Sequence, residues 1–377
     1  MADIVQRNRL VLALQGGGAL GAYQAGVLEA LCRSGLQVDE ICAASIGAVN
    51  AAIFLGNEIN SRASRLHDFW DTIALSDLCN IDAWPSVMPL PHGVRDAYAR
   101  ARAEMQNNYA MSIGVPGFFT RRLLPPYFVG SGSPASASLV DPAPLAKTLD
   151  RLCDFEVLNA SATRLGVVAS NAESGRARYF DTAETIVTRE MIMASGALPP
   201  WFPPVEVDGQ WFWDGALATA APIRRLLTTA KSSERTIVLR VDLWRSDGPV
   251  PDTLPDAEIR MKNIDQAGRS MFVAEALDEQ QHLQKLLAYA LSRLSPQERQ
   301  TDAKLADAAA AAAQFKPMTV VPLDYDGSSQ EKHLKDGQFG RAAIDYHWEE
   351  GRHAFERVLP ELLEALQASS DLTDFSR

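Results

Sequence analysis

The chain has 377 residues, of which 47% are hydrophobic and 22% are charged, a balance that excludes a disordered chain and suits one or two folded domains. The formal net charge of −11 argues against binding nucleic acid or an anionic bilayer through overall charge, since both need an excess of basic residues. The four cysteines are widely spaced and form no Cys-x-x-Cys pair, so we expect reduced thiols rather than disulfides or a metal site.

Residues 1–9 are mixed and polar, and the short apolar run that follows leads directly into glycines. This is not the pattern of a signal peptide, and no segment has enough consecutive apolar residues to cross a bilayer. We therefore expect a cytoplasmic protein whose contact with membranes would be peripheral and made by local apolar surface.

Short apolar runs alternate with helical patterns along the first part of the chain, as they do in α/β proteins. The apolar runs predict buried strands at residues 10–14, 41–44, 165–170 and 237–243. Apolar residues at helical spacing predict helices at 22–31, ended near Gly35, and at 46–55, closed by Gly56.

Residues 77–140 break this alternation, because they are rich in proline, glycine, methionine and aromatic residues. A long irregular stretch inside a compact domain is usually functional or mobile, so we expect a lid or cap over a site. Its aromatic residues Phe118, Phe119, Tyr127 and Phe128 are either core or a substrate-contacting patch that meets lipid. The surrounding prolines and glycines favour the second interpretation.

A second change in composition at residues 247–255 divides the chain in two. We expect a first domain at 8–246, which contains the cap, and a largely helical C-terminal extension at 247–377. Within the extension, the residue pattern predicts a long helix at 259–294, an alanine-rich helix, a strand at 318–322 and a final helix at about 341–366.

A glycine-rich turn, Gly16-Gly17-Gly18-Ala19-Leu20-Gly21, lies between a predicted strand and a predicted helix. Glycines let the backbone turn tightly and bring N–H groups close to an anion, which can be a phosphate or a developing oxyanion. The motif also satisfies Gly-x-Gly-x-x-Gly, with Asp39 at about the right count for a ribose-binding acid. That acid should follow the second strand, whereas Asp39 precedes it, so the dinucleotide interpretation is disfavoured.

Ser45 follows the second strand within Ala43-Ala44-Ser45-Ile46-Gly47. Small neighbours let a serine sit on a sharp strand-to-helix turn with its hydroxyl exposed, although Ala43 replaces the first glycine of Gly-x-Ser-x-Gly. Taken alone, such a serine is more often a helix N-cap. A Ser-His-Asp triad is hard to assemble, because the sequence has no histidine between His92 and His282.

Asp214 follows the aromatic run Trp211-Phe212-Trp213 and precedes Gly215. An Asp-Gly pair is ordinarily a turn. The aromatic residues before it and the apolar helical pattern at 216–227 instead favour a desolvated carboxylate. Such a carboxylate has a raised pKa and is a better base for a serine hydroxyl.

Taken in order, the glycine turn, the serine elbow and an Asp-Gly-Ala after a proline- and phenylalanine-rich segment resemble the patatin-like phospholipases over residues 8–225. The resemblance implies a three-layer α/β/α sandwich with a mostly parallel sheet. It also implies a lipid or other acyl-ester substrate and no metal or other cofactor. The site residues that it implies are a catalytic dyad of Ser45 and Asp214, an oxyanion hole from Gly16, Gly17 and Gly18, and supporting glycines Gly21, Gly47 and Gly215.

Two further positions depart from the family pattern. Leu20 stands where many relatives have lysine or arginine, which favours an acyl ester in general over a phospholipid. Ala220 stands where an asparagine is common, and this departure does not remove the dyad. Residues 260–366 are similar to an extension found in one bacterial subgroup. The resemblance thus implies a serine acyl hydrolase of the lipase or phospholipase A type. Two alternatives stay open: an acyltransferase with the same dyad, and a non-catalytic lipid-binding protein on this fold.

Overall fold

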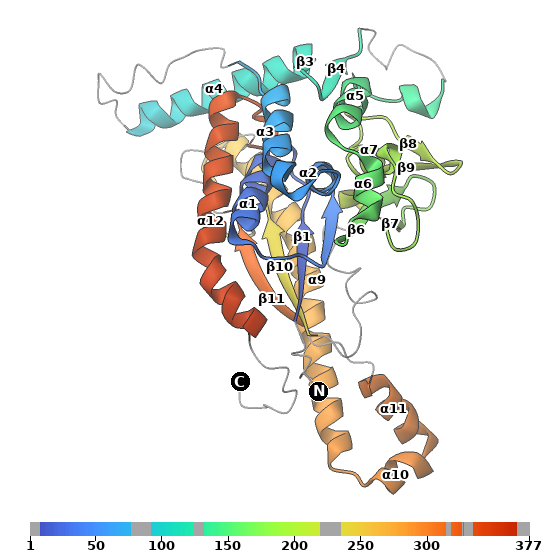
Figure 1. The fold of residues 1–377 in the computed structure, drawn as a ribbon. Coiled ribbons are helices and arrows are strands. Elements are labelled where there is room, and N and C mark those ends of the chain that lie inside the picture. Colours follow the sequence, from blue (N-terminus) through green and yellow to red (C-terminus); the bar gives the residue numbers. More distant parts are fainter. Residues whose placement is uncertain are drawn as a thin grey trace.

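The computed structural model describes residues 8–76, 92–123, 132–218, 235–313, 318–325, 327 and 335–367. Figure 1 shows a central sheet with helices on both faces and a helical arm that extends below it. Within the described residues, eight strands form this sheet in the order β11-β10-β1-β2-β6-β9-β8, and β7 also pairs with β6. The strands are β1 (Arg9–Leu14), β2 (Glu40–Ala44), β6 (Arg164–Asn171), β7 (Ala177–Asp181), β8 (Val205–Val207), β9 (Gln210–Asp214), β10 (Thr236–Asp242) and β11 (Met318–Asp324).

Five neighbouring strands, β11, β10, β1, β2 and β6, run parallel, whereas β7 and β9 are antiparallel to β6. Strands β10, β1, β2 and β6 are almost entirely buried, which is why they appear in the sequence as continuous apolar runs, whereas the edge strand β11 is only partly buried. The predicted strands and the mostly parallel α/β fold are therefore confirmed. The carboxyl ends of the parallel strands lie at one edge, where open α/β sheets bind their ligands.

The helices predicted from apolar spacing are also confirmed. The first ends at Gly35, whose φ of 72° lies in the left-handed region that glycine adopts easily. The described helices are α1 (Gly21–Ser34), α2 (Ile46–Leu55), α3 (Arg62–Ile73), α4 (His92–Ile113), α5 (Ala143–Leu152), α6 (Phe155–Ala160), α7 (Arg189–Ser195), α9 (Leu254–Ser292), α10 (Pro296–Thr301), α11 (Ala303–Ala313) and α12 (Arg341–Gln367).

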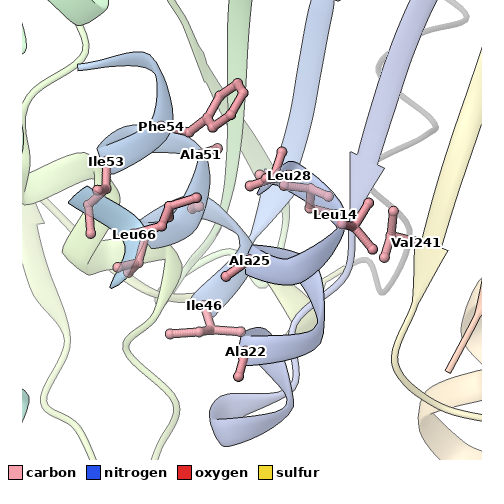
Figure 2. Packing of buried hydrophobic residues seen from close by; sticks show 14 of the residues in the cluster. Leu14, Ala22, Ala25, Leu28, Ile46, Ala51, Ile53, Phe54, Leu66 and Val241 are labelled. Carbon is pink, nitrogen blue, oxygen red and sulfur yellow. The ribbon is translucent and has the colours of Figure 1, made fainter. Parts of the chain in front are cut away.

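The larger core lies between the sheet and the layer that contains α1, α2, α3 and α12. Figure 2 shows how small side chains of α1 let this helix come close to α2 and to the ends of β1 and β10. The residues gathered there include Leu14, Ala22, Ala25, Leu28, Ile46 and Val241. This packing fixes the first two helices against the strand ends from which they start.

The opposite face of the sheet is covered by α9, a helix of 39 residues. Leu277 and Val273 of α9 pack against Val11 and Val238 of the sheet. Figure 1 shows α9 passing behind the sheet and continuing beyond its edge toward α10 and α11. The sheet therefore has helices on both faces, as the α/β/α prediction requires.

The residues after 247 share one sheet and one core with the residues before it. Strand β11 pairs in parallel with β10, and α12 packs against α1. The contact between these helices includes a hydrogen bond from Trp348 Nε1 to Glu29 Oε2 of 2.6 Å. The predicted boundary at residue 247 thus describes a division in sequence, while the two parts are built together in space.

The described part of residues 77–140 is regular, so the prediction of an irregular stretch is wrong there, whereas the role of this segment as a lid or cap stays a prediction. Helix α4 has 22 residues, and β3 (Gly114–Val115), β4 (Phe119–Arg121) and β5 (Val140–Asp141) form a small separate sheet. The glycines and prolines mislead because they flank α4 rather than fill it: residues 92–113 contain Gly93 and no proline. Residues 77–91 and 124–131, with Tyr127 and Phe128, lie outside the described residues.

Three other predictions can be compared with the described part of the chain. No helix in it combines the length and the apolar character needed to cross a membrane. Cys32, Cys42 and Cys153 are free thiols, and Cys79 lies outside the described residues. Of the helix predicted at 216–227, only a short 3-10 turn at Gly215–Leu217 is described, since residues 219–234 are not.

Candidate active site

Three sequence motifs meet at the carboxyl edge of the parallel strands. Strand β1 leads into the glycine turn, β2 ends one residue before Ser45, and Asp214 is the last residue of β9. In the sheet register, Ala44 pairs with Val168, and the next residue of β6, Ala169, pairs with Asp214. Ser45 and Asp214 are thus brought to the same level of the sheet with only strand β6 between them.

Ser45 has a strained backbone that forms a sharp elbow. Its φ of 55° and ψ of −129° are unusual for a residue other than glycine and cost on the order of 1–3 kcal/mol. The Ser45 carbonyl accepts hydrogen bonds from the N–H groups of Ala48 (2.9 Å) and Val49 (3.3 Å), which start α2. The elbow confirms the predicted strand-to-helix turn, and the Ser45 side chain faces a cavity.

Asp214 is a buried carboxyl group that is hydrogen-bonded to the Ser45 side chain. Burial raises the pKa of Asp214 to about 6, and the hydrogen bonds from Ser45 and from the Ala216 N–H only partly oppose this rise. The raised pKa agrees with the desolvated carboxylate predicted from the sequence. A carboxylate with this pKa is ionised at neutral pH and accepts a proton more readily than an exposed aspartate does.

The backbone of Asp214 is held from both sides. Its N–H donates to the Ala197 carbonyl at 2.9 Å, and its carbonyl accepts from the Ser170 hydroxyl at 2.7 Å. One carboxylate oxygen, Oδ1, accepts from the Ala216 N–H at 2.8 Å. The carboxyl group therefore has a defined position that does not depend on Ser45.

The peptide planes of the glycine turn are fixed by two hydrogen bonds. The Gly16 carbonyl accepts from Trp244 Nε1 at 2.9 Å, and the Gly17 carbonyl accepts from the Leu20 N–H at 3.1 Å. In a trans peptide the N–H points opposite to the carbonyl, so the N–H groups of Gly17 and Gly18 point away from these donors. Within the described chain, no protein acceptor takes the N–H groups of Gly16, Gly17 or Gly18.

The glycine turn lies directly against the elbow. A Cβ atom on Gly16 would be only 2.8 Å from Ser45 Cβ, so a larger residue would push the turn away from the serine. Gly18 has a φ of 55° and faces the backbone carbonyl of Asp336. The predicted supporting glycines also stand at close approaches, Gly21 against Ile46, Gly47 against Leu14 and Gly215 against Val168.

Ser45, Asp214 and the three glycines of the turn line one cavity of about 370 Å³. Its size lies within the ~300–1,000 Å³ that is usual for small-molecule sites. Most of the wall is apolar, and no histidine is among the described residues that line it. The apolar lining includes Ile46, Val49, Met111, Phe118, Phe119, Val140, Leu145, Met193, Leu198, Trp201, Phe202 and Phe339.

A small group of polar side chains lines the same cavity next to the glycine turn. It consists of Asn107 of α4, Lys262 and Gln266 of α9, and Asp336. Lys262 forms an ion pair with Asp336, and the Gln266 carbonyl accepts from Gln15 Nε2 at 3.3 Å. The sequence carries no signal for this group, because its members are brought together only by the packing of α4, α9 and the short turn at Lys335–Gly337 around the glycine turn.

Phe118 and Phe119 do not form an exposed surface patch, so that part of the prediction is wrong, whereas their contact with substrate stays a prediction because both residues line the cavity. Phe119 is 3% exposed, and both rings pack against Phe202 and Phe339. Phe118 also contacts Phe69 of α3. Because these partners are distant in the sequence, local composition could not reveal that the two rings form part of the cavity wall.

Asp39, which supported the dinucleotide alternative, lies at the opposite end of the strands from the glycine turn. Its carboxylate accepts from the Leu10 N–H at 2.8 Å, and its carbonyl accepts from the Arg164 N–H at 2.9 Å. Both partners stand at the beginning of their strands, so Asp39 stabilises the edge of the sheet that is remote from the cavity.

Comparison with known proteins gives two family matches along the chain. A model described as Patatin-like phospholipase matches residues 12–227, and one described as Patatin phospholipase matches residues 264–365. The Patatin-like phospholipase domain-containing protein 7 of Rattus norvegicus is 46% identical over 54 residues, which are 14% of this chain and only 4% of that protein.

Two solved structures are similar over most of the chain. VipD from Legionella pneumophila has a TM-score of 0.34 and 13% identity, covering 92% of this chain and 67% of that one. The structure of full-length SpcU in complex with full-length ExoU from the type III secretion system of Pseudomonas aeruginosa has a TM-score of 0.27 and 14% identity. That match covers 81% of this chain and 60% of the other.

Proposed function

The chain belongs to the patatin-like phospholipase family, and from this premise we propose that it is a serine acyl hydrolase of the lipase or phospholipase A type. Ser45 is the nucleophile and Asp214 its general base. The observation that carries this proposal is that the elbow serine and a buried carboxyl group, whose pKa is raised to about 6, line the same largely apolar cavity.

The proposed reaction begins when Ser45 Oγ attacks the ester carbonyl and its proton moves to the carboxylate of Asp214. The tetrahedral intermediate then collapses, the bond to the alcohol breaks, and Asp214 returns the proton to the departing alkoxide. Water attacks the acyl-enzyme next, with Asp214 again taking the proton. The second collapse gives the carboxylic acid product and restores the Ser45 hydroxyl.

The glycine turn supplies the proposed oxyanion hole. The N–H groups of Gly16, Gly17 and Gly18 have no other acceptor within the described chain and belong to residues that line the cavity beside Ser45. One well-placed donor is typically worth ~10²–10³ in rate. Helix α2 begins directly after Ser45, and its N-terminal end adds a positive partial charge near the same oxygen.

The cavity lining suggests how a lipid ester would lie. The apolar wall, with Phe118, Phe119 and Phe202, suits an acyl chain, whereas the polar group around Lys262 and Asp336 suits the alcohol part of the substrate. A lipid substrate is expected for this family, and the head group is the part that would meet the polar side chains.

The first experiment is a panel of lipid and simple esters assayed with the wild type and with Ser45→Ala. A serine hydrolase should turn over at least one ester, and Ser45→Ala should abolish that turnover. A fluorophosphonate probe should label Ser45, and mass mapping that placed the adduct on Ser195 would reject the assignment. Failure of the wild type on every ester, together with retained lipid binding, would favour the non-catalytic alternative.

The acyltransferase alternative needs a separate measurement. Adding an alcohol acceptor such as glycerol during ester turnover would divert the acyl group from water if transfer were the main reaction. A hydrolase should release free acid as its main product at all moderate acceptor concentrations. If the acylated acceptor were the main product instead of free acid, the protein would be an acyltransferase that uses the same dyad.

A further inference from the structure

Ser195, the last residue of α7, lies beside the Ser45 elbow, and its hydroxyl group takes part in two hydrogen bonds with the backbone. It is fully buried and is not among the residues that line the cavity. Its Oγ accepts the Ser45 N–H at 2.9 Å and donates to the Val168 carbonyl at 2.6 Å. A hydroxyl engaged in this way and closed off from the cavity is not available as a nucleophile.

The Ser195 hydroxyl supplies the hydrogen-bond acceptor of the Ser45 N–H, which has no acceptor in the sheet or in the helix. Ser45 stands after the end of β2 and before the first residue of α2, so neither the sheet nor the helix supplies a partner for its N–H. The backbone there has a φ of 55°, which only the surroundings can maintain in a residue other than glycine. The Ser195 hydroxyl fixes this backbone conformation by accepting the hydrogen bond from the Ser45 N–H.

The end of α7 is connected to the proposed base as well as to the nucleophile. Two residues after Ser195, the Ala197 carbonyl accepts the Asp214 N–H at 2.9 Å. The Val168 carbonyl that Ser195 holds also lies against Gly215, the residue after Asp214. Residues 195–197 therefore connect the backbone of Ser45, which follows β2, with that of Asp214 at the end of β9, although β2 and β9 are not adjacent in the sheet.

We propose that Ser195 is a positioning residue for the reaction: its hydroxyl holds the Ser45 elbow so that the Ser45 side chain stays hydrogen-bonded to Asp214. The inference rests on the proposed function, since it assigns a role relative to the nucleophile and base named there. Removing the Ser195 hydroxyl leaves both reacting groups in place but loosens the turn that brings them together.

A positioning role can be separated from a purely structural one by the pH profile. The bond from Ser45 lowers the pKa of Asp214, so loosening it should move the acid limb of kcat/KM to higher pH. Ser195→Ala should also lower kcat by about 10- to 100-fold, the range expected when one buried hydrogen bond is lost. KM should change little, because Ser195 does not touch the cavity.

The matched control is Thr163→Val, which removes another buried hydroxyl that donates to a carbonyl. Thr163 Oγ1 donates to the Val38 carbonyl at 2.8 Å, next to the beginning of β6 and far from its carboxyl end. Thr163→Val should leave kcat and the acid limb at wild-type values. Thermal melting of both variants ensures that each is assayed while folded, and Ser195→Thr, which keeps the hydroxyl, should recover most of kcat.

The outcomes separate this inference from the function on which it rests. If folded Ser195→Ala kept the wild-type kcat and acid limb, Ser195 would be structural only and the inference would be wrong, with the proposed function untouched. If Ser45→Ala kept wild-type turnover, the proposed function would fail, and the positioning role would fail with it. A lower kcat with a shifted acid limb in Ser195→Ala alone is the result that supports the inference.

Discussion

Two serine–aspartate pairs in the described part of the chain have a buried aspartate with a raised pKa, and only one of these pairs has the surroundings of an active site. In the first, Asp214 is hydrogen-bonded to Ser45, and in the second the Ser270 hydroxyl of α9 lies 3.1 and 3.2 Å from the two carboxylate oxygens of Asp242. Burial raises the pKa of each aspartate to about 6. By residue type, and by the burial and pKa of the aspartate, the two pairs are nearly equivalent.

The surroundings of the two pairs differ in three ways. Ser45 sits on a strained elbow, faces the cavity and has the glycine turn beside it, whereas Ser270 is 2% exposed within a regular helix and does not line this cavity. Asp242 also has a cation at hand, since Arg240 Nε lies 2.8 Å from its Oδ2. A serine–aspartate pair whose aspartate has a raised pKa therefore becomes reactive only where the substrate can reach it, the nucleophile is held in place, and backbone N–H donors without an acceptor lie beside it.

The largest difference is expected in catalysis. Ser45→Ala and Asp214→Asn should each lower kcat by several orders of magnitude, because the members of a catalytic unit fail together. Ser270→Ala and Asp242→Asn should keep activity of wild-type order, since their pair touches no substrate. Initial rates on the best ester of the panel test this, and a near-normal kcat in Asp214→Asn would break the assignment of the base.

The second difference is expected in the pH dependence. Asp214 must be deprotonated to act as a base, so kcat/KM should fall about tenfold for each pH unit below a pKa of about 6. Asp242→Asn should leave this acid limb in place although Asp242 has a similar pKa. If the acid limb disappeared in Asp242→Asn and stayed in other variants, the titrating group would be Asp242 and the assignment to Asp214 would be wrong.

The third difference is expected in stability. Between pH 3.8 and about 6, folded Asp214 keeps a proton that the unfolded chain has released, so the free energy of unfolding falls as the pH rises through this window. In Asp214→Asn the buried side chain is neutral at every pH, so this variant avoids the cost of burying an ionised carboxylate. It should be about 1–3 kcal/mol more stable than the wild type at pH 8, and the difference should vanish near pH 4.

Asp242→Asn should not become more stable at high pH as Asp214→Asn does, because the carboxylate of Asp242 also forms an ion pair with Arg240. Its removal leaves the buried guanidinium with Asp324 at 3.7 Å, so we expect a stability at or below that of the wild type. Denaturant unfolding at several pH values measures both variants. Equal stabilisation of the two would mean that the Arg240 pair contributes nothing.

The smallest effect is expected at the polar end of the cavity. The ion pair of Lys262 and Asp336 is partly exposed, and such pairs contribute only about 0–1 kcal/mol, so Lys262→Met should not change the melting temperature. It should change KM by up to about fivefold for esters with a charged head group, and not at all for a neutral short ester. Lys285→Met, an exposed lysine farther along the same helix, is the matched control.

The parts of the site that lie on single elements could be predicted from the sequence. The glycine turn, the elbow at Ser45 and the aspartate at the end of an aromatic strand each have a local pattern, and each stands where a strand ends. The raised pKa of Asp214 was also predictable, because its aromatic neighbours indicate burial. Local patterns carry this information because parallel strands bring their carboxyl ends to one edge.

The rest depends on contacts between residues that are distant in the sequence. Lys262 reaches the cavity because α9 crosses the sheet behind the glycine turn, and Asp336 reaches it from the short turn at Lys335–Gly337. Phe118 is covered by aromatic rings that are distant in the sequence, Phe69, Phe202 and Phe339. One missed element did have a signal: Asp208-Gly209 is a typical two-residue hairpin turn, with φ values of 51° and 75°, and it joins β8 to β9. Recognising it would have placed Asp214 at the end of a hairpin strand.

The most direct test of the central claim is the rate at which Ser45 becomes acylated by a chromogenic ester in a single turnover. Rapid quenching and mass mapping would locate the acyl group in the wild type, Asp214→Asn and Asp242→Asn. We predict an acyl group on Ser45 that forms at similar rates in the wild type and Asp242→Asn, and at least about 10³-fold more slowly in Asp214→Asn. Acylation of Asp214→Asn at the wild-type rate, or an acyl group on another residue, would contradict the dyad.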